Sequence, residues 1–538
     1  MKRNLIAFGI ATLVSGAVLA SEITVPDLET LIRGSGSAVP TGALPELSLP
    51  KPVVIPEVAP AEPDIPEDTP NIAVTDTPTA DIPAPIPPKV TSGGIGGHAE
   101  LGSGSPSVFH GDVLVAQEDG DLPGFTAAFS HDSADGYGTK DSGRGYFDRS
   151  TVLSLLFFHI KASHPWHAGI TARERSDGLQ GLSQDYYSIS TRTVDWTGAL
   201  DFYRNEDAGL RASLSFEGGV YSFAGERPLS ATAPVFSVAD WRGFRMSPGL
   251  SFTASRGEVT AGLHGSYEVE SEAEAGDLQS LRADLQLSWL LDPVTLFATA
   301  GVFYDSEEGI LPPFEAGLRY EREDSLFSKA HISGGLLLTR QNIVDLALED
   351  PFIRKAGLSV YAADWFGKAR LDLSIPSGFS AGLGLLWRRT WDKRYTLVST
   401  GTAGVDGLIN LDLVSRESLE TEASVARAVG IWNLGVSWKA EWMDAPYVDA
   451  VHWLTANAEV ADRSIHELWA LFGDISVAVD GDDLPRLALG FSYRPLGRLK
   501  LTLSAQDLLY LVSADERLIN DIYRERGGSV MLSGRIDF

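Results

Sequence analysis

The fold is decided by the stretch Leu484–Phe538, LPRLALGFSYRPLGRLKLTLSAQDLLYLVSADERLINDIYRERGGSVMLSGRIDF. Apolar and polar residues alternate in three parts of it. The apolar sets are Leu487, Leu489, Phe491 and Tyr493, then Leu499, Leu501, Leu503 and Ala505, then Val530, Leu532, Gly534, Ile536 and Phe538. A period of two places one set of side chains on each face of a strand. The stretch therefore predicts three strands that share one apolar face.

The sequence ends on Phe538, in step with the apolar residues of its last strand. A soluble sheet has no use for an aromatic side chain at its final position. In a barrel that spans lipid, aromatic side chains lie at the membrane–water interface, and the closing strand pairs with the first strand. The terminal pattern therefore favours a transmembrane β-barrel.

This pattern resembles the C-terminal signature of bacterial outer-membrane β-barrels, in which the barrel assembly machinery reads the last strand. The resemblance assigns that assembly signal to Val530, Leu532, Ile536 and Phe538. More narrowly, Leu499–Leu509 and Gly527–Phe538 resemble the end of TonB-dependent receptor barrels. Gln506-Asp507-Leu508-Leu509 stands there in place of a motif like Asn-Leu-Phe-Asp. The resemblance implies the outer membrane as the location of the chain.

The same alternation recurs upstream, for example over 210–217, 281–289, 368–375 and 432–442. A soluble sandwich also alternates, but here the polar face is charged and the strands are many. Tight links near Asp292, Ser377 and Leu496 alternate with longer links over 132–146, 226–239, 268–277, 343–355 and 513–525. We assign the tight links to the periplasm and the longer links to the outside.

The predicted fold class is all-β, a large antiparallel transmembrane β-barrel over residues 93–538, with a disordered Pro-rich N-terminal arm. About 445 residues at ~20 per strand give on the order of 22 strands, with a range of roughly 18–22. No run of ~18 or more apolar residues follows the N-terminal segment, so no transmembrane helix is expected.

The composition excludes several classes of function. The chain has 538 residues, a net charge of −29 and no cysteine. The lack of cysteine removes disulfides and thiolate metal sites. The acidic balance argues against nucleic acid as a partner, because phosphate contacts need cationic side chains. The excess of acid fits either soluble loops or a cation-binding role.

The N-terminus divides into three predicted segments. Residues 1–20 form a signal peptide, with Lys2 and Arg3 before the apolar run Leu5–Leu19. Residues 21–39 contain a short amphipathic stretch that is either a disordered tail or a docking peptide. Residues 40–92 form a Pro-rich periplasmic linker in extended polyproline II conformation, with a reach on the order of 150 Å.

The linker is too rich in proline to form a globular plug, which departs from the TonB-dependent receptors that the C-terminus resembles. The arm is either a spacer or a tether to a periplasmic partner.

Charged residues on the polar faces of the strands are expected to line the barrel lumen. They are Arg282, Asp284, Arg370, Asp372, Lys439, Glu441, Arg486, Arg494, Lys500 and Arg535. One by one, they are expected to pair across strands and hold the wall. Together they make the lumen polar.

Other candidate sites have simpler explanations. Aromatic residues near strand ends are expected to form interfacial girdles rather than a sugar-stacking track; they are Trp166, Trp289, Trp387, Trp391, Trp432, Trp442 and Tyr493. His159, His164 and His167 cluster around a proline turn, so interfacial histidines are favoured over a metal site. His131-Asp132-Ser133 cannot form a triad, because adjacent residues on a strand alternate faces. Gly93–Gly97 is no phosphate loop, since no helix follows.

The sequence leaves two classes of function open. The first is a solute channel or TonB-receptor-like transporter barrel. The second is a structural membrane anchor that tethers a periplasmic partner through the arm. Both require outer-membrane lipid and the barrel assembly machinery as partners. We expect no enzymatic activity, cofactor or metal, and the sequence does not identify a solute.

Overall fold

The computed structural model describes residues 94–538 except 118–121, 138–139, 141, 184–185, 206–207, 227–240, 273–275, 308, 323–325, 355–358, 376–377, 393, 405, 444–450, 463–467, 480–483, 514–517 and 520–521. The predicted signal peptide, the segment 21–39 and the Pro-rich linker lie outside the described residues, so those three predictions remain untested.

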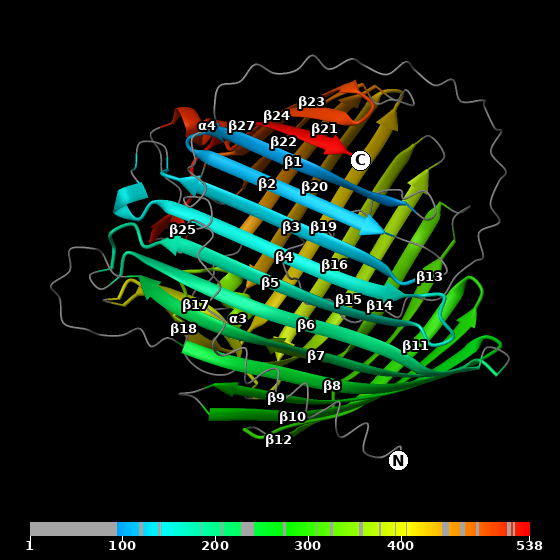
Figure 1. The fold of residues 1–538 in the computed structure, drawn as a ribbon. Coiled ribbons are helices and arrows are strands. Elements are labelled where there is room, and N and C mark those ends of the chain that lie inside the picture. Colours follow the sequence, from blue (N-terminus) through cyan, green and yellow to red (C-terminus); the bar gives the residue numbers. More distant parts are fainter. Residues whose placement is uncertain are drawn as a thin grey trace. The chain divides into compact units, whose positions relative to one another are not determined.

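Most of the described chain forms one antiparallel sheet (Figure 1). Its first half contains β1 (Ile95–Ser105), β2 (Val108–Gln117), β3 (Gly124–Asp135), β4 (Phe147–His159), β5 (Trp166–Gly178), β6 (Ser188–Asn205), β7 (Leu210–Glu226), β8 (Trp241–Arg256), β9 (Val259–Glu272), β10 (Gly276–Leu291) and β11 (Val294–Asp305). Its second half contains β12 (Gly309–Leu311), β13 (Phe314–Glu321), β14 (Phe327–Gln341), β15 (Val360–Ile375), β16 (Phe379–Thr390), β19 (Glu417–Val429), β20 (Trp432–Met443), β21 (Val451–Ala461), β22 (Trp469–Ala478), β23 (Arg486–Leu496), β24 (Leu499–Gln506) and β27 (Ser529–Asp537).

The sheet closes on itself because β1 pairs with β2 along one edge and with β27 along the other. Beyond the last paired strand residues, the amide of Phe538 donates to the carbonyl of Gly97 and the amide of Gly97 donates back, both at 2.9 Å. Of the 23 sheet strands, β12 and β13 pair with successive parts of β11 and together form one interrupted strand, which leaves 22. The predicted barrel and its strand number are confirmed.

The two faces of the wall differ in the way that the alternation predicts. On β10, the Leu281 and Leu285 side chains are 53% and 49% exposed, whereas Asp284 is 3% exposed. The exposed leucines pair with apolar residues of β9 and β11, such as Leu263 and Ala300. An apolar face of this extent is stable in lipid and not in water. The barrel is therefore a membrane-spanning fold.

Antiparallel pairing places successive connections at alternate ends of the barrel. We call one end the turn end, because short connections such as 257–258, 292–293, 430–431 and 497–498 lie there. We call the other the loop end, because 342–359, 391–416 and 507–528 lie there. The long link predicted over 268–277 is wrong in its extent, since β9 continues to Glu272 and β10 begins at Gly276.

The loop end carries its own short elements. They are η2 (Ser142–Arg144), α3 (Ile343–Glu349), β17 (Thr396–Ala403), β18 (Ile409–Val414), α4 (Leu508–Val512), β25 (Leu518–Ile519) and β26 (Tyr523–Arg524). Helix α3 is capped at its N-terminus by Asn342, whose side-chain oxygen accepts from the amide of Val344 at 2.8 Å. Seven residues make no stable helix alone, so α3 depends on the packing of its apolar face. Among the described residues, no helix is long and apolar enough to cross a membrane.

Candidate functional site

Four connections pack together at the loop end in an assembly that we call the loop cover, formed by the described residues of 179–187, 342–359, 391–416 and 507–528. Its centre is a buried apolar cluster of Leu179, Tyr186, Ile189, Phe352, Leu408, Ile409 and Tyr523. These residues come from the β5–β6, β14–β15, β16–β19 and β24–β27 connections and from the start of β6. Strands far apart around the ring are thus joined across the loop end.

Backbone and ring contacts fix the middle of the cover. The Phe352 ring stacks on the Tyr523 ring, with centroids 3.8 Å apart and planes 7° apart. The Ile409 amide donates to the Phe352 carbonyl at 2.8 Å, and the Arg354 amide donates to the Ile409 carbonyl at 2.7 Å. The Tyr523 hydroxyl donates to the carbonyl of Gly407. Burial raises the pKa of Tyr523, so this hydroxyl keeps its proton.

Polar side chains tie the rim of the cover. An Arg354 guanidinium nitrogen lies 2.7 Å from a carboxylate oxygen of Asp406. The Gln180 amide both donates to and accepts from the backbone of Arg524, each at 2.9 Å. The side-chain amide of Gln180 therefore bonds to both backbone groups of Arg524.

Helix α3 reaches from the cover onto the inner wall. Its Ile343, Val344 and Ala347 pack with Tyr221 and Phe223 of β7. At its C-terminus, the Arg175 guanidinium donates to the carbonyls of Leu348 and Glu349, the latter at 3.1 Å. A cation there satisfies carbonyls that lack a partner in the helix.

Carboxylates of α3 also face this wall. Asp345 lies 3.8 Å from an Arg245 guanidinium nitrogen. Burial, together with the nearby Asp345 charge, raises the pKa of Glu349.

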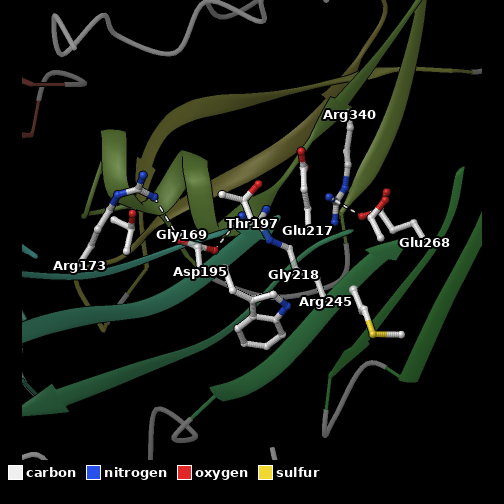
Figure 2. A pocket seen from close by; sticks show the side chains of 13 residues that line it. Gly169, Arg173, Asp195, Thr197, Glu217, Gly218, Arg245, Glu268 and Arg340 are labelled. Carbon is white, nitrogen blue, oxygen red and sulfur yellow. Dashed lines mark hydrogen bonds and ion pairs between the residues drawn. The ribbon is translucent and has the colours of Figure 1, made fainter. Parts of the chain in front are cut away.

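A hollow of about 290 Å³ lies on the inner wall beside α3, lined by side chains of β5–β9 and β14 (Figure 2). Asp195 of β6 stands in the middle of its polar side. One Asp195 oxygen lies 3.2 Å from Arg173 of β5, and the other lies 2.9 Å from Arg245 of β8. Glu217 of β7 also lines the hollow.

An ionic network lines one side of the hollow through Glu268 and Arg340. Arg340 of β14 contacts both Glu268 and Glu270 of β9, and its nitrogen lies 2.9 Å from Glu270. The Tyr221 hydroxyl donates to Glu270 at 3.2 Å, and the Tyr361 hydroxyl donates to Glu268 at 2.9 Å. β9 and β14 are not neighbours in the sheet, so these contacts run across the inside of the barrel.

The structure places the charged residues predicted for the lumen on the face opposite the exposed apolar residues. Arg282 pairs with Asp284 at 2.6 Å, Arg370 with Asp372 at 3.2 Å, and Arg535 with Asp537 at 2.8 Å. These pairs run along one strand instead of across strands, because residues two apart share a face and arginine spans the gap.

The remaining charges of that set are spread around the ring. Arg486 lies 3.2 Å from Glu525, Arg494 lies 3.8 Å from Asp537, and Glu441 lies 3.9 Å from Arg416. Lys439 and Lys500 have no ion-pair partner among the described residues. The set does not converge on one site.

The other candidates also stay apart. His131 bonds to Thr151 at 2.8 Å, whereas Asp132 bonds to His110 at 2.6 Å on the opposite face. The His164 ring bonds to the Asp201 carbonyl at 3.1 Å. Among the described residues, no group of histidine, aspartate and glutamate is arranged to hold a metal ion.

Of the aromatic residues expected at the interface, Trp289, Trp387, Trp432, Trp442 and Tyr493 are exposed on the wall. Trp391 differs, because it packs against the buried cluster that contains Phe303 and Tyr361. Its place in the β16–β19 connection puts it in the loop cover instead of on the lipid face.

Sequence reasoning missed the hollow and the buried network. The stretch 268–272 has the alternation of a strand, with Glu268, Glu270 and Glu272 on one face. Its acidic residues nevertheless led to the prediction of a loop. Helix α3 also had a signal, since Asn342 and Asp345 bracket the start of an apolar run. Contacts between distant loops leave no such local signal.

Solved structures with the same fold include the FrpB iron transporter from Neisseria meningitidis, with 11% identity, a TM-score of 0.60, and coverage of 84% of this chain and 82% of that one. The copper transporter OprC has 11% identity, a TM-score of 0.59, and coverage of 84% and 83%. The siderophore receptor PirA from Acinetobacter baumannii has 8% identity, a TM-score of 0.59, and coverage of 84% and 81%. No protein-family profile matches the chain, and no curated protein matches its sequence.

The similarities to these solved structures concern the fold alone. They confirm the resemblance of this barrel to those of TonB-dependent receptors, which the C-terminal stretch predicted. The fold, together with the apolar outer face, is that of an outer-membrane protein.

Proposed function

We propose that this barrel carries polar solutes across the outer membrane and that the loop cover controls their entry. The observation that carries the proposal is the packing of four loops against one another at one end of a barrel with a polar inner face. A structural anchor needs neither a polar interior nor a cover that joins loops across the ring. The loop end then faces outside and the turn end faces the periplasm.

Two further observations support transport. The similar solved structures are named as transporters and receptors. In addition, every described residue belongs to a strand of the wall or to a connection between strands, so the described part of the chain contains no separate plug domain. In this proposal the loop cover is the barrier that a plug provides elsewhere.

The test is conductance of the purified full-length chain in planar lipid bilayers. The double variant Phe352→Ala, Tyr523→Ala removes the ring stack at the centre of the cover. We expect it to raise single-channel conductance above that of the wild type. Tyr304→Ala is the matched control, because it removes an exposed tyrosine from the outer face of β11 and should leave conductance unchanged.

A cover variant that retains heat-modifiable migration, and therefore its folded barrel, yet conducts no ions would contradict the proposal. That result would instead favour the structural anchor, whose arm lies outside the described residues. Liposome swelling with graded sugars then measures the size of solute that passes.

A further inference from the structure

The hollow beside α3 has charges of opposite sign at its two ends. Figure 2 shows Arg173 on one side, Glu217 and Glu268 on the other, and Asp195 and Thr197 between them. Pairing through β6 relates the two ends, since Arg173 pairs with Thr193 and Glu217 pairs with Thr197. Their Cα atoms are therefore about 13 Å apart along the strands and about 10 Å apart across them. Both side chains line the hollow from these two positions.

The cationic end has donors to spare. The Arg173 side chain is 40% exposed, and among the described residues its guanidinium contacts only Asp195, through a single terminal nitrogen. Its guanidinium has five N–H donors in a planar fork, which suits a carboxylate. Asp195 is shared with Arg245, which also lies 3.8 Å from Asp345. The free donors at this end of the hollow therefore belong to Arg173.

The anionic end has a carboxylate to spare. Glu217 is exposed into the hollow and has no hydrogen-bond or ion-pair partner among the described residues. Its strand neighbours are Thr197 and Ser247, which supply no charge. Farther along, Arg340 is shared between Glu268 and Glu270, so no free cation remains on this side. A ligand with an ammonium group would satisfy Glu217.

We propose that the hollow binds a short zwitterionic peptide of two or three residues, with its carboxylate on Arg173 and its ammonium on Glu217. An anionic solute would meet the unpaired carboxylate of Glu217, and a cationic one would meet Arg173. A single amino acid is too short for the gap, because an extended chain gains only ~3.4 Å per residue. The proposal rests on the transport function above and names its substrate class.

The test is calorimetric binding of trialanine to the full-length chain in detergent, compared with N-acetyl-trialanine and with trialanine amide. Each blocked peptide lacks one of the two charges. A hydrogen bond to a charged group is worth enough to change affinity roughly ten- to a hundredfold. We expect the wild type to prefer trialanine over either blocked peptide by that factor.

Two variants separate the two ends. Glu217→Gln should bind trialanine and N-acetyl-trialanine equally and keep its preference over trialanine amide. Arg173→Gln should do the reverse. Glu422→Gln is the matched control, because it removes another unpartnered carboxylate from the inner face of β19, away from the hollow. The control should retain both preferences, and heat-modifiable migration shows that each variant is folded.

Absence of trialanine binding, equal affinity for all three peptides, or the same change in all three variants would overturn the proposal. The conductance assay keeps the two conclusions apart. If conductance depends on the cover but peptides do not bind, transport stands and the substrate class is wrong. If peptides bind as expected but no variant conducts, the binding site stands and transport is wrong.

Discussion

Leu285 and Gln286 are adjacent on β10, yet they occupy different environments. Leu285 lies on the exposed apolar face and Gln286 on the polar inner face. We predict that Leu285→Arg lowers the free energy of unfolding by ~2–4 kcal/mol, because it places a charge in the hydrocarbon region. Gln286→Arg should cost far less. Denaturant unfolding in lipid vesicles measures both, and equal losses would mean that the faces are wrongly assigned.

Gly219 sits beside the ion pairs of the hollow. An ideal Cβ at this position would lie 2.5 Å from a carboxylate oxygen of Asp195 and 3.1 Å from the Val194 carbonyl. We predict that Gly219→Ala displaces Asp195 and lowers the free energy of unfolding by about 1–3 kcal/mol. Gly367→Ala is the control, because an added Cβ there meets no atom within 4 Å. Thermal unfolding in detergent compares the two, and an unaffected Gly219→Ala would show that Asp195 is not confined.

At the residue scale, the sequence predicted which side chains share a face but not which of them touch. Alternation on β10 separates Leu285 from Asp284 without any structure. The pairing of Arg282 with Asp284 along the same strand was not predicted. A period of two indicates which face a side chain occupies, but not which conformation it adopts on that face. Glu217 likewise belongs to a predicted polar face. That its carboxylate has no partner depends on the positions of its neighbours, which the sequence does not give.

The contact between β14 and β9 rests on a buried ion pair. Glu270 is 1% exposed, and Arg340 is its cationic partner. We predict that Arg340→Met lowers the free energy of unfolding by about 3–5 kcal/mol, because it leaves a buried carboxylate without compensation. Arg370→Met removes a solvent-exposed pair and should cost only about 0–1 kcal/mol. Urea unfolding measures both, and similar losses would show that burial does not govern the two pairs.

The last strand, β27, carries the predicted assembly signal. Phe538 is exposed on the apolar face and is hydrogen bonded to Gly97. We predict that deletion of Phe538 lowers the amount of folded barrel in the outer membrane, because it removes both the aromatic terminus and two hydrogen bonds of the closure. Heat-modifiable migration of membrane fractions measures the folded amount. The same migration and the same surface protease pattern after deletion would contradict the prediction.

Among the elements, long strands with strict alternation were predictable and short loop elements were not. β20 is an example, since Trp432, Leu434 and Val436 alternate with polar residues along its length. Helix α3 and the β17–β18 hairpin are held by contacts with distant parts of the chain. Such elements depend on tertiary packing more than on local propensity.

For the whole molecule, the N-terminal arm is the part whose role is testable apart from the barrel. We predict that deletion of Ser21–Val39 abolishes crosslinking of the arm to an envelope partner while the barrel stays folded, because that stretch holds the apolar residues at the far end of the linker. The signal peptide and the linker are kept as the control. If the intact arm captures no partner, it is a spacer.

Chain length and alternation together predicted the size of the barrel, since about 22 strands were expected and 22 are present. The same reasoning could not predict the loop cover. Its four segments are separated by up to hundreds of positions, as Gln180 and Arg524 show, and only the closed ring brings them together. The candidate site could therefore not be predicted from the sequence, because its segments meet only in the folded barrel.

The seam between β1 and β27 also limits how such a barrel changes in size. The two strands meet antiparallel because the ring holds an even number of strands. Loss of one strand would bring the remaining edges together in parallel orientation, with a different pattern of hydrogen bonds. Loss or duplication of a two-strand hairpin preserves the orientation of the seam. A deletion or duplication that keeps this antiparallel seam must therefore remove or add whole two-strand hairpins, wherever in the wall it occurs.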